Sequence, residues 1–189
     1  MANISMTLFV ISDTHFLHAN ILSFISGKDR AHVRPEFQTV EEMDEHIIEC
    51  WNKTVRPQDH IYHLGDVTML RGKPQYMEPA ARLLRRLNGH KRLVLGNHDH
   101  GKVEWYLQFF EKIKGQNMLD GYLMTHYPVH PGSLGRAKAN VHGHIHRQHV
   151  MQPADALTSH KRDPRYINVS VEVINYTPVA LESLVGLHQ

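Results

Sequence analysis

Residues 7–16 read TLFVISDTHF, and this stretch decides how the rest of the chain is interpreted. Its first half is an unbroken run of apolar and β-branched residues, which is typical of a buried strand of a parallel sheet. The run ends at Ser12, and the carboxylate of Asp13 and the imidazole of His15 follow directly. Open α/β sheets place their ligands at the carboxyl ends of their strands. The stretch therefore predicts an α/β fold with functional side chains after its first strand.

Helical and strand patterns alternate through the first half of the chain. Thr39 stands three residues before Glu42 as a capping box, and apolar residues then recur with helical spacing as far as Val55. The remaining predicted helices cover residues 20–25, 74–87 and 103–110, and the next strands cover residues 60–64 and 92–95. This β-α-β-α-β-α order is typical of a mostly parallel sheet with right-handed crossovers.

The second half predicts another sheet. Its strands are expected at residues 117–119, 122–124, 139–141 and 166–173, with Asp120-Gly121 as a hairpin turn between the first two. We expect a second, mixed sheet packed on the first, within one α/β domain that covers residues 1–189. Residues 127–138 and 147–165 are irregular, and loops of that length in a compact domain are often binding loops.

Composition excludes several classes of protein. Hydrophobic residues make up 41% and charged residues 21%, which argues against overall disorder. A net charge of +2 is too small to indicate a general nucleic-acid binder. Cys50 is the single cysteine, so no intrachain disulfide can form and a reducing compartment is expected. The sequence has no apolar run long enough to span a bilayer and no leader pattern, which predicts a cytoplasmic protein without a membrane partner.

Side chains that can bind metal follow the predicted strands in five short motifs. They are Asp13, His15, Asp66, Asn97, His126, His144 and His146. Each motif alone has an ordinary explanation, because an Asp after a strand is usually a turn or cap residue and paired histidines also occur on surfaces. In extended backbone, residues two apart point the same way, so each Asp-x-His or His-x-His pair can face one site. Carboxylate and imidazole ligands suit Zn, Mn, Fe or Ni.

Together these motifs resemble those of the calcineurin-like metallophosphoesterase superfamily. The matching motifs are Asp13-x-His15, Gly65-Asp66, Gly96-Asn97-His98-Asp99, His126 and Gly143-His144-x-His146. The opening Ser-Asp-Thr-His-Phe and the Asn-Val-Ser-Val-Glu stretch at residues 168–172 also resemble small phage and bacterial members. The resemblance thus extends over nearly the whole chain.

The resemblance implies a four-layer αββα sandwich and a dinuclear metal centre, with Mn the first choice of metal and Zn, Fe or Ni the alternatives. By position, one metal would be held by Asp13, His15 and His146, and the other by Asn97, His126 and His144. Asp66 would bridge them. Two metals about 3.5–4 Å apart can clamp the attacking and leaving oxygens of a phosphoryl group. Our hypothesis is that a metal-bridging hydroxide attacks phosphorus in line.

The same resemblance places His98 opposite the substrate as a catalytic residue that stabilises charge or protonates the leaving group, with Asp99 or another carboxylate orienting its ring. Candidate substrate contacts are Asn97, His98, Arg136, His18 and Asn20. Two of them have common alternative explanations. Asn20 can cap a helix, and Arg136 can be a solvated loop charge that does not pair with phosphate.

The leading hypothesis is a metal-dependent phosphoesterase that acts on a phosphodiester such as a nucleotide, a cyclic phosphate or a nucleic-acid end. A phosphomonoesterase with the same site is the first alternative. A protein phosphatase is disfavoured, because Val-Thr-Met-Leu follows Gly65-Asp66 in place of the longer motif of the Ser/Thr phosphatases. A non-catalytic scaffold that binds a protein partner, and metal storage by the 17 histidines, are alternatives from other classes.

Overall fold

The computed structural model describes residues 6–26, 30–70, 74–99, 103–153 and 161–188. Its first sheet has five strands in the order β4-β3-β2-β1-β9. The strands are β1 (Leu8–Ile11), β2 (His60–His63), β3 (His90–Val94), β4 (Lys112–Lys114) and β9 (Val179–Ala180). Strands β1 to β4 are parallel, whereas β9 pairs antiparallel with β1. The predicted parallel sheet is therefore present, extended at both edges by short strands that the sequence did not predict.

The second sheet has the order β5-β6-β7-β8. Its strands are β5 (Asn117–Leu119), β6 (Tyr122–Met124), β7 (Ala139–His142) and β8 (Tyr166–Asn168). Asp120 and Gly121 both have positive φ in the turn that joins the antiparallel β5 and β6, as a two-residue hairpin of type I′ requires. Strands β6, β7 and β8 run parallel, so this sheet is mixed as predicted. The chain leaves the sheet after Asn168, and the predicted strand to residue 173 is wrong beyond that residue.

The α-helices are α1 (Val40–Thr54), α2 (Met77–Arg85) and α3 (Val103–Tyr106), and the 3-10 helices are η1 (Ala19–Ser23), η2 (Pro74–Tyr76), η3 (Pro131–Ser133) and η4 (Leu181–His188). Helix α1 begins as predicted, because the Thr39 hydroxyl accepts a hydrogen bond from Glu42 N at 3.1 Å. The helix predicted at residues 103–110 ends after its first turn, and the one at residues 20–25 is the 3-10 helix η1.

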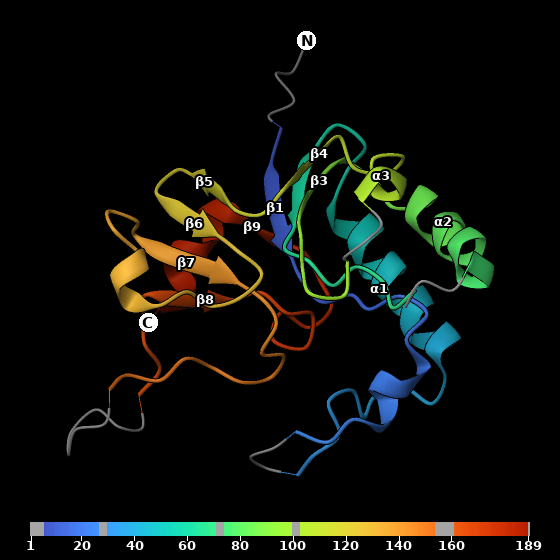
Figure 1. Cartoon of the computed structure of the whole chain (residues 1–189), viewed down its shortest axis with the longest axis horizontal. Coiled ribbons are helices and arrows are strands. Elements are labelled where there is room, and N and C mark those ends of the chain that lie inside the picture. Colours follow the sequence, from blue (N-terminus) through green and yellow to red (C-terminus); the bar gives the residue numbers. More distant parts are fainter. Residues whose placement is uncertain (1–5, 27–29, 71–73, 100–102, 154–160, 189) are drawn as a thin grey trace.

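Successive residues along the strands of the first sheet pack alternately into two separate hydrophobic cores. Ile11, Ile61 and Leu93 pack with the apolar face of α1, and Trp51 of that helix is completely buried. Their neighbours in sequence, such as Val10, face the second sheet and form the other core with it. Figure 1 shows the two sheets beside each other, with α1, α2 and α3 on the outer side of the first. The structure thus confirms an α/β fold with two mixed sheets.

The order of four layers stays a prediction. The described residues after β4 contribute only the 3-10 helices η3 and η4, and Leu181 and Leu184 of η4 pack into the core between the sheets. Within the described ranges, no helix combines the length and the apolar character needed to cross a bilayer.

Candidate metal centre

The loops that follow β1, β2, β6 and β7 are joined by backbone hydrogen bonds where the two sheets meet. Asp13 N donates to Gly65 O at 3.0 Å, and Gly143 N donates to His126 O at 2.9 Å. A parallel bridge between Ser12 and Ser170 links the first sheet to the chain that leaves the second. These bonds bring motifs from both sheets to one place, as expected for the carboxyl ends of parallel strands.

Three glycines of the motifs permit this close approach. A Cβ atom on Gly96 would overlap the carboxylate of Asp66, and one on Gly143 would overlap the carboxylate of Asp13. Gly65 has a φ of +93°, and its Cβ would overlap the backbone of Gly96. The glycine in each motif is therefore a packing requirement of the site, since any side chain there would push a candidate ligand away.

Five of the seven candidate ligands have left-handed backbone: Asp13, His15, Asp66, His144 and His146, with φ between 48° and 70°. The expectation that Asp-x-His and His-x-His lie in extended backbone is therefore wrong. Non-glycine residues adopt this conformation at a cost, and such residues cluster at active sites and ligand clamps. Hydrogen bonds on both sides of these residues, such as the one from His15 N to Asp66 O at 3.0 Å, fix the loops and offset the cost of this backbone conformation.

A first cluster contains Asp13, His15 and His146, which offer ligand atoms within 4.8 Å of one another. Asp13 is fully buried, and its carboxylate accepts hydrogen bonds from Ser170 Oγ at 3.0 Å and His144 N at 2.9 Å. Burial raises the pKa of Asp13, against the opposing effect of His146. Burial and the charge of Arg34 hold the pKa of His15 well below its ordinary value, so its imidazole is neutral and can donate a lone pair.

The Nε2 atom of His15 provides a test of whether this cluster suits a metal. It is buried and makes no hydrogen bond with any residue in the described part of the chain. It lies 3.6 Å from Asp66 Oδ2 and 3.9 Å from Asp13 Oδ1, too far for hydrogen bonds. A buried polar atom without a partner is costly, and imidazole and carboxylate converging on one point is the ligand set that divalent transition metals prefer. The residues fit a metal ion.

A second cluster contains Asp66, His126 and His144, again with ligand atoms within 4.8 Å of one another. His126 Nδ1 lies 2.8 Å from Leu64 O, which can only accept, so Nδ1 carries a hydrogen. His126 Nε2 then faces Asn97 Oδ1 at 2.9 Å and Asp66 Oδ2 at 3.3 Å. Burial alone would lower the pKa of His126, but Asp66 and Asp13 outweigh it and raise the pKa. A positive charge, as a proton or a metal ion, is thus favoured between these atoms.

Asp66 connects the two clusters. Its Oδ2 atom is close to His15 of the first cluster and His126 of the second, and its Oδ1 accepts a hydrogen bond from His98 N at 2.8 Å. Burial alone would raise the pKa of Asp66, but the hydrogen bonds and the nearby histidines lower it, which keeps the carboxylate ionised. A single carboxylate between two histidine-rich clusters is the arrangement expected of a bridging ligand.

His98 lies at the open side of the clusters. Its side chain is 37% exposed, and its Nε2 is 3.8 Å from Asp66 Oδ2. Its ring meets that of His15 edge-on, with centroids 5.5 Å apart. His98 can therefore reach a group bound at the clusters while remaining accessible to solvent.

The interpretation of Asp99 as a catalytic residue that orients His98 is wrong. Asp99 is buried, and its carboxylate accepts hydrogen bonds from Asp66 N and Gly96 N at 2.8 and 2.9 Å. It also accepts from Val67 N at 3.0 Å and from the Tyr106 hydroxyl at 3.0 Å. Its oxygens are thus engaged by two motif loops, and burial raises its pKa. Asp99 holds the backbone of Asp66 in place, and none of its described hydrogen bonds is made with His98.

The candidate substrate contacts separate into different environments. His18 is buried, and its Nδ1 lies 3.3 Å from Nδ1 of His15, so it contacts the ring of that candidate ligand. Asn20 is exposed and lies inside η1, whose N-cap is His18, so the capping role considered for Asn20 is wrong. Arg136 is exposed in the loop before β7, and among the described residues no contact joins it to either cluster. Asn97 Oδ1 lies 2.9 Å from Nε2 of His126, a candidate ligand of the second cluster.

Arg34 and Glu172 were missed by the sequence analysis. Both side chains are completely buried, and Glu172 Oε1 lies 2.8 Å from Arg34 Nε and 3.0 Å from His146 Nδ1. Arg34 also donates to the carbonyl oxygens of Asp13 and Thr14, at 2.5 and 3.0 Å. Burial alone would raise the pKa of Glu172, but the charge of Arg34 and the hydrogen bond from His146 lower it to about 2. The Arg34–Glu172 ion pair therefore holds both Asp13 and His146 of the first cluster in place. Because His146 Nδ1 is engaged by Glu172, its Nε2 is left as the atom that can bind a metal.

Comparisons with known proteins define the family but assign no activity. No model of a known protein family matches the chain. The protein of unknown function AQ665 from Aquifex aeolicus has a similar solved structure, with a TM-score of 0.67 and 27% identity over 97% of this chain and 100% of that one. A nuclease, MPE from Pseudomonas putida, reaches a TM-score of only 0.47 at 16% identity, over 74% of this chain and 61% of that one, which is too low to support an inference.

A sequence relative gives a firmer result. The uncharacterized protein MJ1445 of Methanocaldococcus jannaschii is 37% identical over 182 residues, which are 95% of this chain and 90% of that protein. The aligned stretch therefore takes in nearly the whole of both proteins. The chain therefore belongs to the family of MJ1445.

Proposed function

We propose that the protein is a metal-dependent phosphoesterase of the calcineurin-like metallophosphoesterase superfamily, with the four-layer αββα arrangement of that superfamily. The observation that carries this proposal is the position of Asp66 Oδ2, 3.6 Å from His15 Nε2 and 3.3 Å from His126 Nε2. Because His15 Nε2 is buried without a hydrogen-bond partner among the described residues, a cation is the simplest group to complete the site.

Two divalent ions, with Mn²⁺ the first choice, would be held by the two clusters described above. One set is Asp13, His15 and His146, the other is Asn97, His126 and His144, and Asp66 is shared. When bound, such ions supply Lewis acidity at the phosphoryl oxygens and lower the pKa of water to near neutral. Neutral imidazoles suit this purpose, and burial keeps His15 in that form.

His98 is the residue that we assign to the substrate. Its backbone N–H is fixed by Asp66, while its half-exposed ring is able to approach a phosphoryl or leaving oxygen. Donation of a hydrogen bond or a proton from this ring would offset negative charge that builds on the leaving oxygen. The buried carboxylate of Asp99 contributes indirectly, because it holds the Asp66 and Gly96 backbone.

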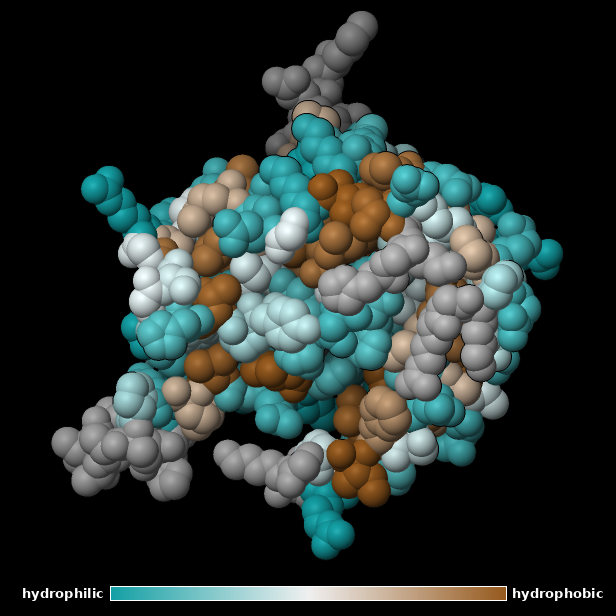
Figure 2. Space-filling model, in the orientation of Figure 1, coloured by the Kyte–Doolittle hydropathy of each residue, from teal (hydrophilic) through white to brown (hydrophobic). Residues whose placement is uncertain are grey.

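We favour phosphodiesters over phosphomonoesters as substrates because the His98 side chain is 37% exposed and a pocket of about 610 Å³ is lined by His144 and His146, which leaves room for a second ester group. A binding scaffold is less favoured. On the face shown in Figure 2, polar residues divide the hydrophobic surface into several separate patches, whereas a docking face is typically one large patch. Metal storage is also less favoured, because the potential ligand groups found in the described ranges are these two compact clusters.

The test is hydrolysis of an aryl phosphodiester and of its monoester by metal-stripped protein reconstituted with Mn, Zn, Fe, Ni or Mg. Asp66→Asn is the control, because the amide keeps the size of the side chain and removes its charge. Diester turnover that requires added metal and disappears in the variant would support the proposal. A preference for the monoester would keep the site and change the substrate class. Two bound metals without turnover of either ester would favour the scaffold.

A further inference from the structure

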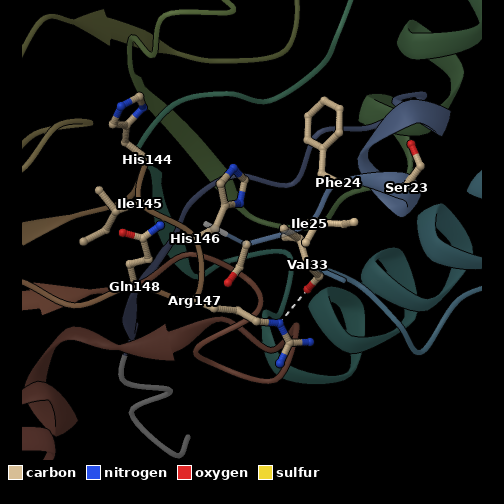
Figure 3. Close-up of a pocket in the computed structure, with 10 residues that line it drawn as sticks. Ser23, Phe24, Ile25, Val33, His144, Ile145, His146, Arg147 and Gln148 are labelled. Atoms are coloured by element: carbon tan, nitrogen blue, oxygen red, sulfur yellow. Dashed lines mark hydrogen bonds between the residues drawn. The ribbon is translucent and has the colours of Figure 1, made fainter. Parts of the chain in front are cut away.

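A pocket of about 610 Å³ opens directly beside the candidate metal centre. Its floor is formed by the segment that carries His144 and His146, and its opposite wall by the chain just after η1. Figure 3 shows Phe24 and Ile25 on one side of His146, with Ile145 and Gln148 on the other. The volume lies within the range of pockets that bind small organic ligands, about 300–1,000 Å³.

The walls of this pocket are largely apolar, in contrast to the charged clusters next to it. Phe24 is 44% exposed and Ile25 is 58% exposed, although both are large hydrophobic residues. Val33 and Ile145 complete the apolar lining. Single exposed hydrophobic side chains are ordinary, but several that line one hollow are a feature of ligand pockets.

The wall that contains Phe24 is held in a fixed position by its backbone. Phe24 O accepts a hydrogen bond from Val33 N at 2.8 Å, and Ile25 pairs with His32 in an antiparallel bridge. The Phe24 ring meets the ring of His18 edge-on, with centroids 5.4 Å apart, which leaves part of the ring exposed. A ligand ring can therefore pack on Phe24 without rearrangement of the backbone.

The pocket is not suited to a second phosphate. The cation on its rim, Arg147, already donates to Val33 O at 2.6 Å and to Glu36 at 2.7 Å, as the dashed line in Figure 3 shows for the first. Ser23 and Gln148 add neutral polar groups to the lining. Apolar walls with a few neutral polar groups match a flat aromatic ring that carries hydrogen-bonding edges, more closely than an anion or a long alkyl chain.

We propose that this pocket binds the aromatic ring of the substrate, a nucleobase, while the phosphate group of the same molecule lies at the metal centre. The inference rests on the proposed function and narrows its substrate class to nucleotide esters. His144 and His146 are common to the pocket and the clusters, so a phosphate bound there carries its organic substituent next to Phe24. Stacking on Phe24 then provides the affinity for the base.

The experiment measures binding by calorimetry, so that it does not depend on turnover. Manganese-loaded protein is titrated with thymidine 5′-monophosphate, with ribose 5-phosphate, which lacks a base, and with inorganic phosphate. We expect the nucleotide to bind about tenfold more tightly than the sugar phosphate, as stacking of a base on an aromatic side chain predicts. Phe24→Ala should remove this preference and leave inorganic phosphate binding unchanged.

Met118→Ala is the matched control, because Met118 is also a large hydrophobic residue, 55% exposed, and lies on β5 away from the pocket. Ile25→Ser is a second pocket variant and should weaken nucleotide binding in the same direction. Equal binding of the nucleotide and the sugar phosphate, or an unchanged preference in Phe24→Ala, would overturn the pocket proposal. Failure of all three phosphates to bind would instead count against the phosphoesterase function itself.

Discussion

Glu172→Gln tests whether one buried ion pair holds the first metal cluster in place. The substitution keeps the size of the side chain and can keep an oxygen where Oε1 now accepts from Arg34 Nε and His146 Nδ1. It removes the negative charge and puts an NH2 group in place of Oε2, which is buried and has no hydrogen-bond partner among the described residues. The described oxygen acceptors of the Arg34 guanidinium would then all be neutral: the amide oxygen of the new side chain and the carbonyl oxygens of Asp13 and Thr14.

The expected loss of stability follows from the burial of this pair. Both side chains are completely buried, so solvent cannot compensate the cation that remains. Removal of one partner of a buried ion pair costs about 3–5 kcal/mol, and we expect the lower end, about 3 kcal/mol, because the amide oxygen still accepts hydrogen bonds. A domain of ordinary stability, about 5–15 kcal/mol, would remain folded after this loss.

The same change should weaken one metal site selectively. A ligating histidine gains orientation and basicity from the carboxylate that accepts its other N–H, and loss of that partner typically costs about 10–100-fold in metal affinity. Among the described residues, no hydrogen bond or ion pair joins Glu172 to the cluster that contains His126, so the metal affinity of that cluster should be retained. We therefore expect the variant to bind one Mn²⁺ at the wild-type affinity and a second about tenfold more weakly.

Two assays separate these effects. Urea unfolding in the presence of a chelator gives the free energy of unfolding without metal, and equilibrium dialysis gives the two metal affinities. Glu78→Gln is the control, because Glu78 is 59% exposed and pairs with Arg82 on the surface, where an ion pair contributes less than about 1 kcal/mol. If Glu172→Gln is no less stable than Glu78→Gln and binds both metals normally, the reasoning about this ion pair is refuted.

Three other substitutions have distinct expected outcomes. Burial raises the pKa of Asp44 from its ordinary 3.8 to about 7, so the folded state retains a proton that the unfolded state releases. The contribution of Asp44 should therefore lower the free energy of unfolding by about 4 kcal/mol as the pH rises from 4 to 8. Asp44→Asn should flatten that decline when urea midpoints are compared at pH 5 and pH 8; an unchanged slope would show that Asp44 is ionised in the folded protein. Gly96→Ala should displace the Asp66 carboxylate and abolish binding of both metals, as measured by dialysis. Binding of two metals per protein in this variant would contradict the close approach of Gly96 to Asp66. His98→Ala should bind both metals and lose about 10²–10⁴-fold in turnover of an aryl phosphodiester, whereas loss of a metal would identify His98 as a ligand.

The position of the site was accessible from the sequence because it depends on strand ends alone. Asp13 and Asp66 follow apolar runs, and parallel strands bring their carboxyl ends to one edge whatever the details of packing. Both strands of the β5–β6 hairpin were predicted at their observed bounds, because Asp120-Gly121 specifies the turn chemically. The edge strand β4, by contrast, has three residues with one apolar side chain, which is too short for a periodic pattern.

The finer organisation of the site was not accessible, since it arises from contacts between distant residues. Arg34 is 138 positions from Glu172, and no local pattern marks an arginine that will be buried. Glu172 ends the Asn-Val-Ser-Val-Glu stretch that was recognised, which was the available signal. The left-handed backbone at His15 has a similar origin, because non-glycine residues adopt it only where surrounding contacts impose it. Asp99 resembled a catalytic residue because sequence position does not reveal which way a side chain points.

The distribution of buried charge explains why the centre and the fold depend on each other. Burial of a carboxylate is costly unless positive charge lies beside it, and the Arg34–Glu172 pair is balanced within itself. Asp13 and Asp66 have no such arginine, and the groups around them are histidines, of which His15 is held neutral by its surroundings. Binding of divalent cations would balance these two carboxylates and use the lone pair of His15. The left-handed loops and the motif glycines thus maintain an arrangement of charges that is unfavourable in the metal-free protein and favourable in the metal-bound protein.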